Sequence, residues 1–211
     1  MRLSLIGMSG SGKSYWSKRL AEHGFKLFCC DDLIAAKLAA ELTGAKGHTI
    51  SMGEWMGFPY EHHYKERESQ YLACEVEVLT EILAYLASNE VNSREKIVID
   101  TTGSVVYTGE EILGELRQYT TIVYLSVPPE TQEELLNAYL SNPQPMLWKG
   151  IFHKDPHETN EEALTRCYPQ LMNERQLLYE RYADVTIGYH RCRARGFMVQ
   201  QFLDAVTSTG C

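Results

Sequence analysis

The chain has 211 residues and a formal net charge of −8, with 44% hydrophobic and 23% charged residues. This composition is typical of one globular domain with a sizeable core, and it excludes extensive disorder. No apolar stretch approaches the ~20 residues of a membrane-spanning helix. The negative charge argues against a nucleic acid partner. We expect a cytoplasmic protein, because the first strand begins at Met1 and leaves no room for a signal peptide.

The first motif is a phosphate-binding pattern, G-x-x-x-x-G-K-[ST], at residues 7–14. Residues 3–6 read as a strand before it, and Trp16 and Leu20 mark one face of a helix after it. In this setting backbone N–H groups turn inward around the phosphates, Lys13 supplies a positive charge, and Ser14 offers a hydroxyl to Mg²⁺. The residues expected to bind the nucleotide are Gly7, Ser9, Gly10, Ser11, Gly12, Lys13 and Ser14.

Five strand-like segments alternate with helical stretches, at residues 2–6, 26–30, 96–101, 121–127 and 184–188. Such an alternation favours a parallel sheet that is covered by helices on both faces. The apolar run Ile97-Val98-Ile99 agrees with this, and we expect strands without a polar face. The sequence therefore predicts an α/β fold with a five-stranded parallel sheet, in a single domain over residues 1–211.

Two segments are longer than a simple crossover between strands needs. Residues 60–89 carry apolar side chains near helical spacing, so we expect a long helix inside a substrate-binding helical region at about residues 45–90. Residues 141–160 include Pro143, Pro145, Gly150 and Pro156 and cannot form one continuous helix. We expect this stretch to be a lid over the site.

Polar residues follow two of the expected strands, at the sheet edge where open α/β folds bind ligands. Asp31 and Asp32 follow the second strand, and Asp100 comes shortly before Thr102-Gly103-Ser104 at the end of the third. An aspartate beside the nucleotide can hold Mg²⁺ or accept the proton of a substrate hydroxyl. We assign Lys13, Asp31 and Asp32 to catalysis, Ser14, Asp31 and Asp100 to the metal, and Asp32 with residues 102–104 to the substrate. Which of Asp31 and Asp32 faces the acceptor stays open. The competing interpretations are helix capping by Asp31 or Asp32 and a structural role for Asp100.

The order of these features resembles the shikimate kinase family of P-loop small-molecule kinases along most of the chain. The resemblance is carried by residues 7–14, 28–32, 98–106, 123–131 and 173–184. It implies the three-layer P-loop kinase fold, the cofactors ATP and Mg²⁺, and transfer of the γ-phosphoryl group to a hydroxyl of a small molecule. It also implies that Arg175, in an Arg-x-x-Leu-Tyr segment, contacts the substrate or the transferred phosphate.

The departures from the family pattern fall on residues that would select the substrate. One acid of the family's aspartate pair is replaced by Cys29 or Cys30, and its triple glycine is replaced by residues 102–104. Leu72 and Gln144 stand where two arginines are expected, which leaves Arg175 alone. A carboxylate is best held by bidentate arginines. We therefore expect an acceptor other than shikimate.

Three functions fit the sequence. The first is an ATP-dependent kinase that acts on a hydroxyl of a small metabolite. The second is a nucleoside or nucleotide kinase, although no arginine occurs between Arg117 and Arg166 to hold the phosphates of a phosphorylated acceptor. The third is a non-catalytic regulatory protein that binds nucleotides. The sequence leaves the acceptor and the oligomeric state open.

Weaker candidates have plainer interpretations. The expected lid carries three potential cations that are most simply solvated, Lys149, His153 and Lys154. Four aromatic residues are equally consistent with a pocket wall and with core packing, namely Trp55, Phe58, Tyr60 and Tyr64. The six cysteines and the histidines lack metal-site spacing, so we expect reduced thiols and no zinc site.

Overall fold

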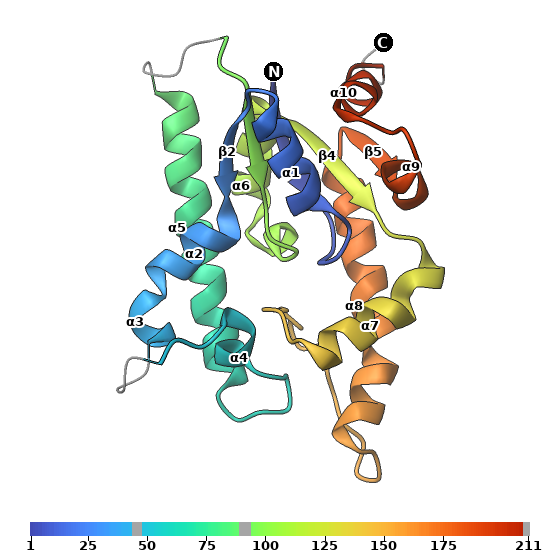
Figure 1. The fold of residues 1–211 in the computed structure, drawn as a ribbon. Helices are drawn as coiled ribbons and strands as arrows, with labels where there is room; N and C mark the ends of the chain where they lie inside the picture. The colour runs from blue at the N-terminus through green and yellow to red at the C-terminus, as the bar shows by residue number, and fades with distance from the viewer. Residues whose placement is uncertain (44–47, 89–93, 209–211) are drawn as a thin grey trace.

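The fold is built on one parallel sheet (Figure 1). The computed structural model describes residues 1–43, 48–88 and 94–208. Its strands are β1 (Arg2–Ile6), β2 (Lys26–Cys29), β3 (Ile97–Asp100), β4 (Thr121–Ser126) and β5 (Val185–Gly188), in the order β2-β3-β1-β4-β5. All neighbouring pairs are parallel. The five-stranded parallel sheet expected from the sequence is confirmed, with every strand end within one residue of its expected position.

Helices cover both faces of the sheet. One face packs on α1 (Lys13–Glu22), α9 (Tyr189–Arg193) and α10 (Val199–Thr207), and the other on α2 (Cys30–Lys37), α5 (Tyr64–Ala87), α6 (Glu110–Tyr119) and α8 (Asn160–Tyr182). Side chains alternate along β1, so Leu5 joins the core beneath α1 and Ile6 joins the core beneath α5 and α8. The three-layer arrangement is therefore confirmed.

The edge strands differ from the expectation that no strand has a polar face. In β5 the burial alternates, with Val185 and Ile187 buried and Thr186 and Gly188 exposed. In β2 no residue is fully buried. Both strands lie at an edge of the sheet, where fewer neighbours cover them. Only the central strands β3, β1 and β4 lack a polar face, as expected. One polar side chain is nevertheless buried in β1: the hydroxyl of Ser4 lies 2.8 Å from that of Thr120.

The chain segments that connect the strands and the longer helices contain further helical pieces. These are α3 (Ala39–Leu42), α4 (Met52–Met56) and α7 (Gln132–Ser141), with single 3₁₀ turns at Val105–Tyr107 and Pro129–Thr131. The long helix expected within residues 60–89 is α5. Residues 45–47 and 89–90 of the expected helical region lie outside the described residues. Of the helices described, none is long and apolar enough to cross a bilayer.

The connection from α7 to α8 is irregular, as its prolines predict, and its first half is packed against the helices below it. We call residues 143–148 the roof segment. Met146, Leu147 and Trp148 are buried in it. The hydroxyl of Tyr64 on α5 donates to the carbonyl of Met146 at 2.7 Å and accepts from the backbone N–H of Trp148 at 2.8 Å.

The roof segment also touches α4 at a glycine. A Cβ atom at Gly53 would lie 1.7 Å from the carbonyl oxygen of Pro143, so the two backbones approach each other more closely than any side chain allows. The roof segment is thus fixed to both α4 and α5.

Candidate active site

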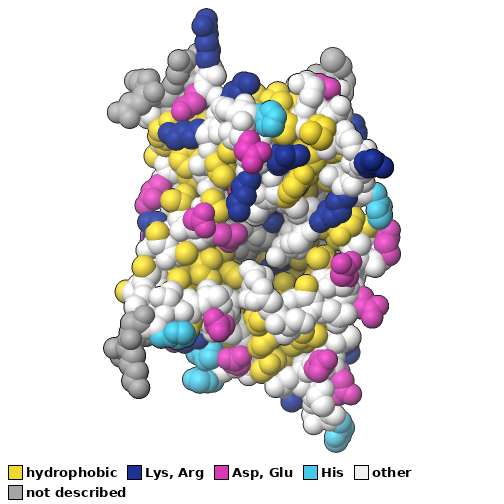
Figure 2. Space-filling model, viewed as in Figure 1, with side chains coloured by type: hydrophobic (Ala, Val, Ile, Leu, Met, Phe, Trp, Pro, Cys, Tyr) yellow, Lys and Arg dark blue, Asp and Glu magenta, His cyan; other side chains and the backbone are white. Residues whose placement is uncertain are grey.

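A cavity of about 340 Å³ opens at the carboxyl ends of the strands. In Figure 2 the face with this opening is hollowed near its centre, with acidic and basic side chains around the hollow. The cavity brings together most of the residues expected from the sequence, namely Ser9, Gly10, Gly12, Lys13, Ser14, Asp31, Thr102, Gly103 and Arg175. It adds Tyr15, which was not expected there, Tyr71 from the expected substrate-binding helical region, and Pro145 and Met146 from the expected lid.

The phosphate loop forms one wall of the cavity. Gly7 has φ +141°, and a Cβ atom there would lie 2.7 Å from the Leu125 carbonyl oxygen, so the start of the loop requires glycine. The ammonium group of Lys13 donates to the carbonyls of Gly7 at 2.8 Å and Met8 at 3.1 Å. Burial lowers the pKa of Lys13, and the nearby carboxylates of Asp100 and Asp31 act in the opposite direction. Lys13 therefore lies at the inner side of the loop, where two backbone carbonyls bind its Nζ atom.

A second cation holds the loop from outside. Arg193 on α9 donates to the carbonyls of Gly10 at 2.9 Å and Ser11 at 3.3 Å, and its guanidinium lies 3.6 Å from the ring centroid of Tyr189. The sequence analysis did not assign Arg193 to the site. Gly7 and Ser11 do not line the cavity, so their expected contribution to nucleotide binding is through the loop backbone.

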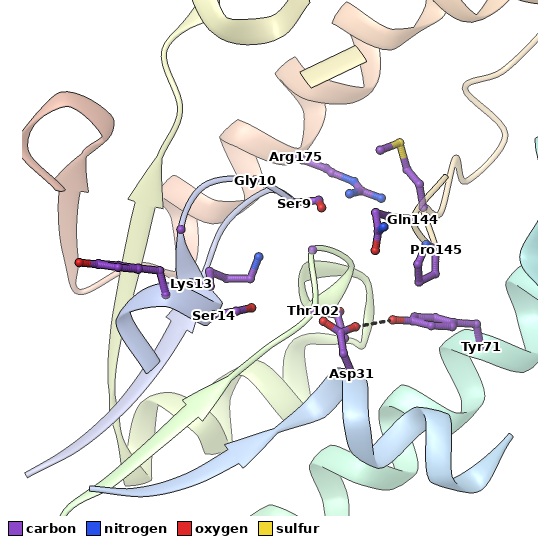
Figure 3. A pocket seen from close by; sticks show the side chains of 14 residues that line it. Ser9, Gly10, Lys13, Ser14, Asp31, Tyr71, Thr102, Gln144, Pro145 and Arg175 are labelled. Atoms are coloured by element: carbon purple, nitrogen blue, oxygen red, sulfur yellow. Dashed lines mark hydrogen bonds between the residues drawn. The ribbon is translucent and has the colours of Figure 1, made fainter. Parts of the chain in front are cut away.

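The structure separates the two aspartates that follow β2. The helix α2 begins at Cys30 with Cys29 as its cap residue, so Asp31 and Asp32 lie in its first turn and the capping interpretation is wrong. Asp31 points into the cavity and accepts a hydrogen bond from the Tyr71 hydroxyl at 3.2 Å (Figure 3). Burial raises the pKa of Asp31, and Lys13 opposes that shift. Asp32 is exposed and lines a neighbouring cavity instead.

Asp100 is buried near the phosphate loop, and one of its two carboxylate oxygens has no hydrogen-bond partner among the described residues. The residue is 3% exposed, and its Oδ2 accepts from the Ser17 hydroxyl at 3.0 Å. Its Oδ1 is buried and has no hydrogen-bond partner among the described residues. A buried, unpaired carboxylate oxygen is a group that a cation or its bound water can satisfy. A purely structural role accounts for Oδ2 but leaves Oδ1 unexplained.

The donors fit Mg²⁺ shared with phosphate. Within the described ranges no group of three or more His, Cys, Asp or Glu side chains is placed to hold a metal ion by itself. Protein sites for Mg²⁺ commonly supply only one or two carboxylates, and substrate phosphates and water complete the shell. Ser14 lines the cavity, and Asp31 and Asp100 both act electrostatically on Lys13. Ser14 and Asp100 are the residues that would hold Mg²⁺ beside a bound nucleotide, whereas Asp31 is engaged by the Tyr71 hydroxyl.

The loop after β3 is tied to a buried acid on α5. Glu75 is completely buried and accepts hydrogen bonds from the hydroxyls of Ser104, at 2.6 Å, and Thr102. Burial raises the pKa of Glu75 to about 7. Thr102 and Gly103 line the cavity, whereas Ser104 does not. The expected role of Ser104 in substrate binding is therefore at most indirect, through the shape of this loop.

Arg175 connects the cavity to the roof segment. The side chain is 2% exposed, donates to the Leu147 carbonyl at 2.7 Å, and lies 5.4 Å from the ring centroid of Tyr107. Its Nε is buried without a hydrogen-bond partner in the part of the chain that the structure describes. Arginine stays charged even when buried. Arg175 thus brings one positive charge and one unused donor to the cavity from α8.

The weaker candidates lie elsewhere. None of Trp55, Phe58, Tyr60 and Tyr64 lines the cavity, and Trp55 and Tyr64 belong to the core. Lys149, His153 and Lys154 are also absent from its lining, and His153 contacts Arg166 and Cys167. The five described cysteines are free thiols, and Cys211 lies outside the described residues.

The comparisons with known proteins locate this site in a known fold. No protein-family model and no curated protein matches the sequence. Among solved structures, shikimate kinase from Acinetobacter baumannii in complex with shikimate matches with a TM-score of 0.63 and 22% identity, over 99% of this chain and 94% of that chain. The chain has the shikimate kinase fold.

Two further solved structures share it. Shikimate kinase from Aquifex aeolicus vf5 matches with a TM-score of 0.61 and 18% identity, over 99% of this chain and 97% of that chain. The enzyme from Bacteroides thetaiotaomicron gives a TM-score of 0.59 and 17% identity, over 99% of this chain and 95% of that chain. The resemblance drawn from the sequence is confirmed for the fold. Of the two residues expected to replace family arginines, Gln144 lines the cavity and Leu72 does not.

Proposed function

We propose that this protein is a kinase that transfers the γ-phosphoryl group of ATP to a hydroxyl of a small metabolite other than shikimate. The observation that supports the proposal is the shared cavity. Lys13 and Ser14 of the phosphate loop line the same 340 Å³ space as Asp31 and Arg175. In Figure 3 the loop side chains lie on one side of this space and Gln144 and Pro145 of the roof segment on the other. A phosphoryl donor and a hydroxyl acceptor would meet between them.

On the nucleotide side of the cavity, ATP would be bound by charged side chains and by the backbone of the phosphate loop. Lys13 would exchange its two loop carbonyls for phosphate oxygens, because a phosphate is the stronger acceptor for an ammonium group. Ser14 and Asp100 would hold Mg²⁺, which supplies charge neutralisation on the phosphates when bound, and Asp31 would remain free for the acceptor. Arg193 binds the Gly10 and Ser11 carbonyls and would hold the loop in shape around the phosphates.

The acceptor side uses Asp31 and Arg175. Asp31 would accept the proton of the attacking hydroxyl, and its raised pKa makes it a stronger base than an exposed aspartate. Tyr71 orients the carboxylate through its hydrogen bond. The unused Nε of Arg175 would donate to an oxygen of the transferred group and stabilise the charge that develops there.

The first test is nucleotide binding by calorimetry at millimolar Mg²⁺. Wild type should bind ATP, and Lys13→Ala should abolish turnover, because no other side chain lining the cavity supplies an ammonium group to the phosphates. Lys18→Ala removes an exposed lysine from the same helix and should leave ATP binding and turnover unchanged. Thermal melts of all three proteins would show that the variants remain folded.

Two outcomes would contradict the proposal. If the protein binds neither ATP nor GTP, the phosphate loop is not a nucleotide site and the proposed kinase function is refuted. Binding of ATP without ADP release in the presence of a broad panel of hydroxylated metabolites would instead favour a non-catalytic nucleotide-binding protein.

A further inference from the structure

A second cavity adjoins the active-site cavity at the roof segment. This second cavity has a volume of about 390 Å³ and lies between α2, the residues around α4, and residues 143–145. Asp31, Gln144 and Pro145 line both cavities. Each volume falls within the range of small-molecule sites. An acceptor that passes between Asp31 and Gln144–Pro145 would therefore occupy more space than the first cavity offers.

The two adjoining cavities are lined by side chains of opposite charge. Lys13 and Arg175 line only the first cavity. Asp32 lines only the second, and Asp31 stands between the two. Among the described residues neither aspartate forms an ion pair with a lysine, arginine or histidine, and no basic side chain lines the second cavity. A carboxylate placed there would face two acids, whereas an ammonium group would be attracted by both.

The uncharged lining of the second cavity fits the rest of such a molecule. Leu42, Ile50 and Met52 offer apolar contacts to a carbon skeleton, and Thr49 offers a hydroxyl. At the opposite end the buried Nε of Arg175 is a donor without a partner among the described residues, in a side chain that is 2% exposed. At this end the guanidinium of Arg175 supplies positive charge for an oxygen of the transferred group.

We infer that the acceptor is a hydroxylated amine, with its hydroxyl beside Asp31 in the first cavity and its protonated amine beside Asp32 in the second. The inference rests on the proposed kinase activity and names the class of its acceptor. In the transfer, the bond between the γ-phosphorus and the bridging oxygen of ATP breaks, and a bond from the acceptor hydroxyl oxygen to that phosphorus forms. The hydroxyl proton passes to Asp31, and the products are ADP and a phosphate ester that keeps its ammonium group.

The test compares amines with matched uncharged compounds. Wild type with a saturating non-hydrolysable ATP analogue and Mg²⁺ would be titrated with glucosamine against N-acetylglucosamine, 2-deoxystreptamine against scyllo-inositol, and ethanolamine against ethylene glycol, with shikimate as the carboxylate probe. We expect at least one amine to bind at least about tenfold more tightly than its uncharged partner, since charge-assisted hydrogen bonds are the stronger ones. Shikimate should bind more weakly than that amine.

Substitutions then assign the amine contact. Asp32→Asn should reduce the affinity for the preferred amine about fivefold to tenfold and leave the affinity for its uncharged partner and for the ATP analogue unchanged. Asp204→Asn makes the same chemical change at an exposed position on α10 and should change none of these affinities.

Each other outcome overturns the inference. Equal binding of amines and uncharged partners, no binding of any amine, or tighter binding of shikimate would show that the second cavity does not select an ammonium group. An amine preference that survives in Asp32→Asn would remove the assigned contact. If the ATP analogue binds in all these cases, the proposed nucleotide site stands, whereas a failure of the analogue to bind would refute the proposed function itself.

Discussion

The buried acid Glu75 makes a specific prediction about stability and pH. It is completely buried on α5, and its pKa is raised to about 7 from an ordinary value of 4.5, chiefly because burial disfavours the charged carboxylate. At pH values below 4.5 the residue is protonated in the folded and unfolded states, so it adds no pH-dependent term to stability. Above pH 4.5 the unfolded chain releases the proton first, which favours unfolding. The resulting penalty grows up to about pH 7 and is constant above it.

The magnitude follows from the pKa difference. A shift from 4.5 to about 7, at 1.36 kcal/mol per pH unit, corresponds to about 3 kcal/mol. Glu75→Gln cannot ionise, and its amide can still bond the hydroxyls of Thr102 and Ser104. If the amide forms weaker hydrogen bonds, the free energy of unfolding of Glu75→Gln is lowered by the same amount at every pH. Between pH 4.5 and pH 8 the free energy of unfolding of wild type should therefore fall by about 3 kcal/mol relative to that of Glu75→Gln.

Urea unfolding at several pH values between 4.5 and 8 measures this difference directly. Glu66→Gln, at an exposed position on the same helix, is the matched control and should follow wild type at every pH. If the unfolding free energies of wild type and Glu75→Gln change in parallel across this range, the burial argument for Glu75 is refuted.

Two further predictions concern the active-site cavity and its roof. Asp31→Asn should lower kcat by more than ~100-fold and leave ATP affinity within a few-fold, because a base for the hydroxyl acts mainly in the transition state; a variant with a lower melting temperature and a normal rate would show that Asp31 is structural. Gly53→Ala should destabilise the protein by about 1–3 kcal/mol in chemical denaturation, because its Cβ would lie 1.7 Å from the Pro143 carbonyl. Gly114→Ala, where no atom lies within 4 Å of the added Cβ, should be neutral or stabilising, and equal effects of the two glycine substitutions would contradict the close approach at Gly53.

Short stretches of sequence were enough to predict the strands and the phosphate loop. Apolar runs located all five strands to within one residue, because strand formation and burial follow from those runs. The phosphate loop was found because glycine positions, Lys13 and the following helix lie next to each other in the sequence. Arg175 came from the resemblance to shikimate kinases, and it lines the cavity.

Other features depend on exact helical positions. A shift of one residue turns a side chain by about 100° around a helix. The sequence could therefore not decide between Asp31 and Asp32 until the start of α2 was known. Glu75 carried a signal that went unused, since it falls at helical spacing with Tyr71, Val78 and Leu79 on the buried face of α5. An acid at such a position has to be hydrogen-bonded, and this could have suggested partners among residues 102–104.

The roof segment could not have been predicted from local sequence. Tyr64 and Met146 are 82 residues apart, and no periodic pattern connects them. The contact between Gly53 and Pro143 is likewise a meeting of two irregular backbones. The prolines indicated only that residues 141–160 are not one helix. Which side of the segment packs inward is decided by tertiary contacts with α4, α5 and α8.

The contacts of the roof segment bear on access to the site. Residues 143–148 pack against Gly53 of α4 and are hydrogen-bonded to Tyr64 of α5 and Arg175 of α8. The cavity is open at the face shown in Figure 2, so small molecules can reach it while the roof segment stays in place. A change at Gly53, Tyr64 or Arg175 would therefore alter the shape of the cavity rather than the access to it.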